Sequence, residues 1–388
     1  MKINLITTKA DIKDVYVRGG HILECFEKEA FGRTTFRYAF LDPATGLSNE
    51  ISPEIGNYSL IPVRNCIWQS EAAYFASYRV QDTGKALITI FRHDSKTKET
   101  KEIFSYEEDV PENSESRKTS VFIFQGSLIL IQNEDLFFPD DSSAAQVSFS
   151  QVLINCENGT RIRIKDKNLI KNGINTIIPV SKTHILLKTG FSHPEDERFR
   201  NIPEEGALIE SVYYGITSSF LSSSQLENAT EGFKMISTAY NKRNILMPHT
   251  AGDYIHFTIV EPEKGTGETI FYNFKTDNTL TCQDLSLDPD DMRIAYVINN
   301  VPYIRQSHGN QVDFINLLTS DTECVFYDER FAAALGDLLM FSKVRREKTF
   351  LRGYRLPNLE LVFETRGTFA AGCRDNEKYY IYVNIKNN

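Results

Sequence analysis

Apolar and polar residues alternate along much of the chain, which is the pattern of half-buried β-strands. In the segment DYIHFTIVEP, Tyr254 and His256 would face one side of a strand, while Ile255 and Phe257 would face the other. We interpret His256 as a structural histidine whose hydrogen bonds are satisfied. Similar runs are predicted at 73–80, 86–93, 120–124, 127–132, 147–155, 183–189, 207–217, 254–261, 268–274, 293–298, 338–344 and 378–384.

Turn-forming sequences separate these runs. Examples are DTGK at 82–85, ENGT at 157–160, KTDN at 275–278 and HGNQ at 308–311. The best helical candidate, 331–339, fits a pair of strands equally well. Many short strands at even spacing predict an all-β sandwich, barrel or propeller.

A repeat is clearest from Leu285, in LSLDPDDMRIAYVINNVPYIRQSHGNQVDFINLLT. It predicts a first strand, a DPDD turn, the strand MRIAYV, a loop, the strand PYIRQ, a turn and a closing strand. The turn is formed by Asp288, Pro289 and Asp290, with Asp291 in place of a glycine; the next strand opens with Arg293, Ile294, Ala295 and Tyr296. This segment resembles the TolB-type propeller repeat, which also occurs in prolyl-oligopeptidase-like propellers. The resemblance covers one repeat, 285–319, and implies an architecture rather than an activity.

Weaker copies begin at Arg37, Phe331 and Thr368. We therefore predict a single domain, 1–388, that is a β-propeller of seven or eight four-stranded blades. The expected blades are 11–55, 59–107, 118–168, 174–228, 232–281, 284–325, 329–366, and 368–388 with 1–8. The last is half a blade, which a strand at 2–7 would complete. Pairing of the N- and C-terminal strands would close the propeller and leave little exposed edge.

Composition agrees with strands and limits the partners. The 388 residues include 26 Phe and 18 Tyr but one Trp, and aromatic side chains favour strands. The net charge of −9 argues against nucleic acid or an anionic membrane as partner. It agrees with simple solubility, and also with a basic protein or peptide partner.

The six cysteines do not have zinc-ligand spacing, because no two lie close together in the sequence. The N-terminal segment MKINLITTKADIKD contains no apolar run long enough for a signal peptide. We therefore expect a cytoplasmic protein with reduced cysteines.

Four polar segments are the candidate functional loops, and our register places all four on one face of the propeller. They are 134–146, 190–206, 248–253 and 345–348. The segment 190–206 is long for a tightly turned repeat, and long loops often carry function. The candidate residues in the four segments are Phe137, Phe138, His193, Glu195, Asp196, Arg198, Arg200, His249, Arg345 and Arg346.

These residues allow several interpretations. His193 and His249, with Glu195 or Asp196, would hold a divalent metal ion or act as an acid–base pair; the alternative is that all are solvated loop residues. The four arginines would bind a carboxylate or phosphate, or simply form surface salt bridges. Phe137 and Phe138 would contact a partner or pack against their own blade.

Three functions follow from these features. The first is a binding or scaffold propeller that holds a protein or peptide on its loop-rich face. The alternative is a metal-assisted lyase or hydrolase that acts on a small acidic substrate in the central funnel. The third is a stabilising partner within a larger complex. The sequence contains no G-x-S-x-G, Walker A or G-x-G-x-x-G motif, so neither a serine hydrolase nor a nucleotide cofactor is indicated.

Overall fold

The computed structural model describes most of the chain. The described ranges are 2–8, 12–18, 21–30, 33–42, 47–50, 59–61, 72–81, 83–94, 96–109, 114–125, 128–137, 146–164, 174–180, 183–191, 209–216, 230–240, 243–246, 248–286, 293–375 and 377–385. Within them nearly all regular structure is β-strand, and the one helical element is the short 3-10 helix η2 (Pro262–Lys264). None of the helical structure in these ranges has the length and apolar character to cross a membrane.

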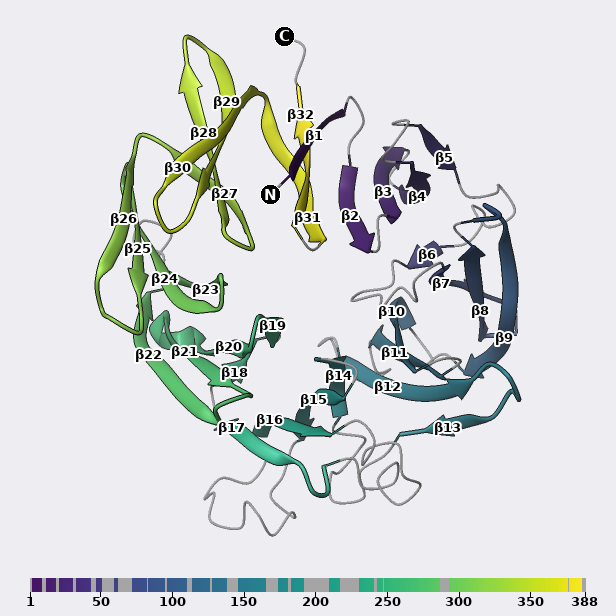
Figure 1. The fold of residues 1–388 in the computed structure, drawn as a ribbon. Helices are drawn as coiled ribbons and strands as arrows, with labels where there is room; N and C mark the ends of the chain where they lie inside the picture. The colour runs from purple at the N-terminus through teal and green to yellow at the C-terminus, as the bar shows by residue number, and fades with distance from the viewer. Residues whose placement is uncertain are drawn as a thin grey trace. The chain divides into compact units, whose positions relative to one another are not determined.

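The described strands form eight sheets (Figure 1). The first two contain β2 (Ile12–Arg18), β3 (His21–Ala30), β4 (Arg33–Leu41) and β5 (Ser48–Glu50), then β6 (Ser59–Ile61), β7 (Ala72–Val80), β8 (Lys85–Asp94) and β9 (Thr100–Asp109). The next two contain β10 (Ser114–Gln125), β11 (Leu128–Phe137), β12 (Gln146–Asn155) and β13 (Arg161–Arg163), then β14 (Ile174–Pro179), β15 (His184–Phe191), β16 (Ile209–Ile216) and β17 (Lys234–Tyr240).

The remaining four sheets follow the same order. The fifth contains β18 (Asn244–Ile245), β19 (His249–Ala251), β20 (Tyr254–Glu261), β21 (Thr266–Asn273) and β22 (Asn278–Ser286). The sixth and seventh contain β23 (Arg293–Ile298), β24 (Val301–His308), β25 (Gln311–Asn316) and β26 (Thr322–Tyr327), then β27 (Arg330–Leu335), β28 (Leu338–Arg345), β29 (Lys348–Arg355) and β30 (Glu360–Arg366). The eighth contains β31 (Thr368–Asp375), β32 (Lys378–Asn384) and β1 (Lys2–Thr8).

Seven of these sheets have four or five strands that neighbour one another in chain order, and their pairing is antiparallel. This is the blade of a β-propeller, so the predicted all-β propeller class is confirmed. Residue contacts divide the chain into two compact units, Met1–Val15 with Lys242–Asn388, and Tyr16–Asn241. The single domain 1–388 stays a prediction.

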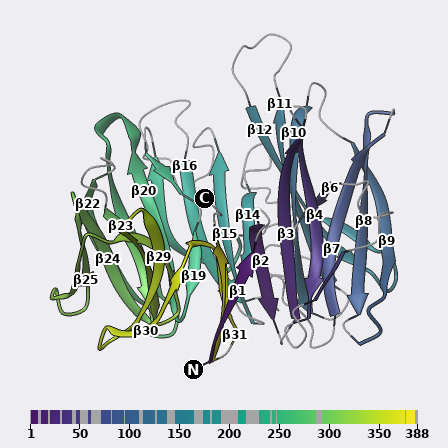
Figure 2. The same ribbon diagram turned by 90° about the horizontal axis from the view of Figure 1, so that it is seen from above.

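Both chain ends meet in the eighth sheet, as predicted. β1 pairs with β32 in parallel, with Leu5 opposite Ile381, and the Lys2 N–H donates to the Glu377 carbonyl at 3.0 Å. Figure 1 shows β1 beside β32, and Figure 2 shows β1 and β31 of this sheet together. The N-terminal strand therefore covers an edge of β32 that would otherwise be open to pairing with another chain.

Two predicted blade boundaries are wrong. The predicted blade 232–281 includes 234–240, but this segment is β17 and pairs with β16 of the preceding sheet. The predicted blade 284–325 begins with a strand at Leu285, but Leu285 lies in β22 and pairs with Gly267. The first strand of that blade is β23. The sequence of a strand does not show whether the strand is the first of one sheet or the last of the sheet before it. That position is decided by pairing with strands far away in the sequence.

The segment 331–339 is a strand pair and not a helix. β27 ends at Leu335, β28 begins at Leu338, and Gly336 lies between them with a φ of 57°. Side chains from β25, β26 and β28 then form an aromatic core, in which Phe326 stacks on Phe341 with ring centroids 3.9 Å apart. Phe314, fully buried, packs edge-on against both rings.

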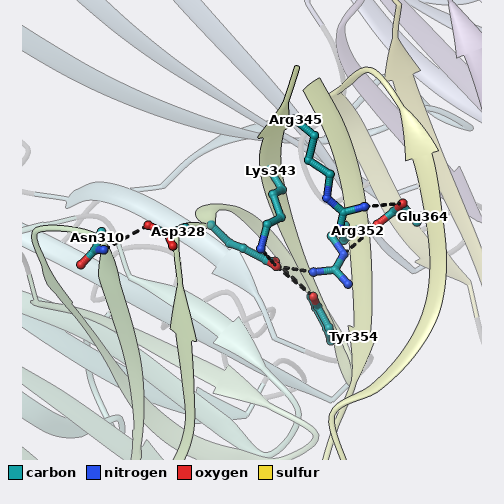
Figure 3. A network of polar contacts seen from close by, with 8 residues as sticks. Asn310, Asp328, Lys343, Arg345, Arg352, Tyr354 and Glu364 are labelled. Atoms are coloured by element: carbon teal, nitrogen blue, oxygen red, sulfur yellow. Dashed lines mark hydrogen bonds and ion pairs between the residues drawn. The ribbon is translucent and has the colours of Figure 1, made fainter. Parts of the chain in front are cut away.

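A buried carboxylate links the sixth and seventh sheets. Glu329 lies between β26 and β27, and its side chain is 5% exposed. It accepts hydrogen bonds from Arg352 and from the Tyr354 hydroxyl, the latter at 3.1 Å, and Lys343 Nζ lies 3.4 Å away. Figure 3 shows Lys343, Arg352 and Tyr354 pointing toward one another. Two cations and a hydroxyl on β28 and β29 thus hold the link between the sheets.

Removing this carboxylate should cost far more stability than removing an exposed charge of the same network. We expect Glu329→Ala to lower the free energy of unfolding by roughly 3–5 kcal/mol, because partly buried Lys343 loses its ion pair and partly buried Arg352 keeps only the one with Glu364. The control is Arg345→Ala, which removes the 3.2 Å ion pair with Glu364 at an exposed site and should cost less than about 1 kcal/mol. Urea denaturation measures both values, and equal losses would contradict this role for Glu329.

Candidate functional site

The first strand of the fifth sheet is interrupted. β18 and β19 both pair with β20, first with Ile245 opposite Ile259 and then with His249 opposite His256. The first strand advances four residues over this stretch while β20 advances three. One extra residue in an antiparallel strand is a β-bulge, and it reverses which side chains face each side of the sheet.

A proline lies at the interruption. Pro248 has no N–H to donate to β20, and prolines within sheets are confined to edges and bulges. The last backbone bond before it runs from the Leu246 N–H to the Thr258 carbonyl, at 2.8 Å. The bulge places His249 on the same face of the sheet as His256, since directly opposite residues share a face.

The two histidines form a close pair. Their ring centroids are 5.7 Å apart, and the His256 ring also stacks on Phe271, which belongs to β21. The Nδ1 atom of His256 is buried and has no hydrogen-bond partner among the described residues. The interpretation of His256 as a satisfied structural histidine is therefore wrong for this atom.

Both imidazoles are neutral at pH 7. Burial, and to a smaller extent the neighbouring His249, lower the pKa of His256 to about 4. The pKa of His249 is lowered too, because part of its ring is removed from water, although the residue as a whole is exposed. A neutral imidazole donates one hydrogen bond and accepts one, and an anion bound nearby would raise its pKa.

The histidine pair lines a cavity of about 630 Å³ within the unit that contains Lys242–Asn388. Its walls are formed by β20 and by the first strands of the fifth, sixth and seventh sheets, which are β18 with β19, β23 and β27. The lining residues are Leu246, His249, Ala251, His256, Phe257, Thr258, Arg293, Ile294, Ala295, Tyr296, Val297, Ala334 and Gly336. Most are apolar, and none of these described residues carries a carboxylate.

The wall opposite the histidines is β23. Ala295 and Val297 pack against Tyr254 and Phe271 of the fifth sheet, so this face of β23 is turned toward the histidine face. Arg293 lies on the same face by strand alternation. When the Gln306 amide is turned so that its oxygen faces the donors of Arg293 and His308, this oxygen accepts from Arg293 Nη2 at 3.0 Å and from Arg293 Nε at 3.2 Å.

The backbone of β23 also faces the cavity. β23 ends its sheet, and β24 is its one partner among the described strands. Val297 lies opposite Pro302 of β24, which has no N–H. The Pro302 carbonyl accepts a hydrogen bond at 3.0 Å from the N–H of Leu317, just after β25, so it points away from β23. This pair is therefore not hydrogen-bonded, and the N–H and C=O of Val297 point away from β24. By strand alternation, the N–H and C=O of Ala295 also point away from β24.

The candidate segment 248–253 is not a loop between second and third strands. It consists mainly of β19 and the turn that leads into β20. It therefore lies at the end of the sheet where the turns connect each blade's first strand to its second. Asp253 in this turn joins neighbouring turns, because it contacts Lys275 Nζ at 2.7 Å and Asn300 Nδ2 at 2.9 Å. The hydrogen bond from Lys275 lowers the pKa of Asp253.

Arg345 and Arg346 lie elsewhere, on the turn between β28 and β29, where both are exposed. Turns alternate between the two ends of an up-and-down sheet, so a second-to-third turn and a first-to-second turn occupy opposite ends. The prediction that 248–253 and 345–348 share one face is therefore wrong. Arg345 pairs with Glu364 (Figure 3), and anion binding by these arginines stays a prediction.

The other candidates cannot be placed. His193, Glu195, Asp196, Arg198, Arg200 and Phe138 lie outside the described residues, and Phe137 is the last residue of β11. Within the described ranges, no three His, Cys, Asp or Glu side chains are grouped so as to hold a metal ion. A metal site of His193 with His249 stays a prediction. Sequence reasoning missed His256, Arg293 and Tyr296, and Pro248 inside a strand pattern was the signal of the bulge.

Comparison with known proteins shows the class of fold. No family profile matches the sequence. No curated protein sequence is significantly similar to it. The fold is similar to Porphyromonas gingivalis dipeptidyl peptidase 4, with a TM-score of 0.50 and 11% identity over 91% of this chain and 52% of that one. This chain thus spans about half the length of that protein.

Two further structures are similar at lower scores. They are Pyrococcus horikoshii acylaminoacyl peptidase (TM-score 0.48, 12% identity, 96% of this chain and 65% of that one) and the β-propeller domain of the Trilobed protease from Pyrococcus furiosus (0.43, 12%, 92% and 95%). The protein is a β-propeller. The predicted resemblance to prolyl-oligopeptidase-like propellers is confirmed for the architecture, and these identities say nothing of activity.

The neutral state of His256 predicts a specific loss of stability in acid. Between pH 6.5 and about 4 the unfolded histidine is protonated while the folded one is not, so the free energy of unfolding falls as the pH is lowered. We expect this contribution to be on the order of 2 kcal/mol. It should be absent in His256→Gln and present in His308→Gln, as measured by urea denaturation across this range. An identical pH dependence in wild type and His256→Gln would contradict the assignment.

Proposed function

We propose that this protein is a binding propeller that holds an extended segment of a polypeptide partner in the cavity between β20 and β23. The observation that carries the proposal is the outward-pointing backbone of Val297 and Ala295 on an otherwise apolar wall. An added strand gains main-chain hydrogen bonds from such an edge, and its alternate side chains enter the space beside it.

The size and lining of the cavity support this function. A volume of about 630 Å³ lies within the range of ligand pockets and accommodates a few residues. Apolar residues such as Leu246, Phe257 and Ile294 would contact the segment's side chains, while His256 offers a polar group for orientation. The described lining contains no serine, cysteine or carboxylate, so it offers no paired nucleophile and acid.

A lyase or hydrolase that acts on a small acidic substrate is the second candidate. The pair of neutral histidines favours it, because a neutral imidazole can accept a proton from a substrate. Such an enzyme would need further ligands or acids beyond the described lining. Conversion of a small carboxylic acid into a product by the wild-type protein, with loss of that activity in His256→Gln, would support this candidate over the first.

The edge of β23 provides a direct test of the binding function. Val297→Pro removes the outward N–H while leaving the β23–β24 hydrogen bonds intact, and Val297→Ala removes only side-chain packing. For peptides selected from a random displayed library by the wild-type chain, we expect Val297→Pro to weaken binding at least about tenfold more than Val297→Ala, by loss of a main-chain bond in a desolvated site. Fluorescence anisotropy measures the affinities. The proposal fails if no peptide is selected, or if both variants bind alike.

A further inference from the structure

We propose that the cavity between β20 and β23 selects a carboxylate attached to an apolar group, held between Arg293 and the pair His249 and His256. This inference deepens the proposed function, since it assigns the anchoring group of the bound segment. It rests on three features of the site: the charges that line the cavity, the two faces that meet there, and the unpaired imidazole nitrogen.

The charges of the lining favour an anion. Arg293 is the cationic residue among the described lining, and no carboxylate lies among those same residues. A guanidinium binds a carboxylate well, because its N–H groups match the two oxygens. One contact of Arg293 is the Gln306 amide, which orients the guanidinium.

The geometry brings the histidines to the same space. Arg293 lies on the face of β23 that packs toward the fifth sheet, and His256 lies on the wall of β20 that lines the same cavity. His249 lies beside His256, with the ring centroids 5.7 Å apart. An anion between these strands would therefore meet a guanidinium on one side and two imidazoles on the other.

The described lining brings two kinds of titratable or charged group to the side of the cavity where His256 lies. They are the neighbouring imidazole of His249 from β19 and the guanidinium of Arg293 from β23. Phe271 of β21 packs against the His256 ring. The first strand of the seventh sheet, β27, contributes Ala334 to the cavity wall, and Gly336 follows just after that strand. Tyr296 lies on the opposite face of β23 and packs against Phe331; burial raises the pKa of its phenol, which stays neutral.

Proton uptake should accompany anion binding. Both histidines have lowered pKa values in the free protein, and a bound carboxylate raises the pKa of a neighbouring imidazole. The complex therefore binds more protons than the free protein as the pH falls below neutrality. Affinity for the carboxylate should rise over the same range, until the ligand itself becomes protonated.

The experiment compares acids with their neutral amides. Isothermal titration calorimetry uses hydrocinnamate and its amide, and N-acetyl-leucyl-phenylalanine as free acid and as amide. We expect each acid to bind at least about tenfold more tightly than its amide. Arg293→Gln should remove this difference, while Arg366→Gln, which removes an exposed arginine at the end of β30, should keep it. Binding of both acids would identify small carboxylates as sufficient; binding of the peptide acid alone would identify a chain terminus.

The pH profile provides a second readout. Between about pH 7.5 and 5.5, the affinity for the acid should rise at least about fivefold in wild type and less than about twofold in the double variant His249→Gln with His256→Gln. Equal affinities for acid and amide would overturn the carboxylate inference. Failure of both acids to bind would overturn it as well. In either case the binding function would stand if library-selected peptides still depend on the Val297 N–H.

Discussion

The pairing between the first strand of the fifth sheet and β20 shifts by one residue between Ile245 and His249. Without this shift, His249 would lie on the other face of the sheet and could not neighbour His256. Pro248 stabilises the interruption, because it cannot donate the hydrogen bond that a regular strand would need there. The position of the histidine pair, and so the polar side of the cavity, depends on this single extra residue.

The electrostatics of the cavity follow from that arrangement. Two imidazoles placed close together and partly removed from water both stay neutral, because each additional charge would be poorly solvated and would repel the other. Arg293 on the opposite wall is then the source of positive charge within the described lining. A site of this kind is apolar with one cationic end, which suits a ligand that is apolar with one anionic end.

The sequence predicted the strands, the propeller class and the closure by β1, since alternation and turn composition are local signals. It did not predict which strand begins each sheet: 234–240 and Leu285 were assigned to the wrong blades because pairing is long-range. The turn-like composition of 248–253 concealed β19, and the alternation around His256 suggested a satisfied core residue. Register across the bulge, which no local pattern encodes, decides both cases.

The central claim is that a polypeptide segment pairs with the free edge of β23. Residue-resolved hydrogen exchange with and without a library-selected peptide tests it most directly. We predict slower exchange at Ala295 and Val297, whose N–H groups point away from β24, with little change at Ile294 and Tyr296, which already bond to β24. Protection confined to the segment 190–206, with Ala295 and Val297 unchanged, would contradict the claim and place the partner on the loops instead.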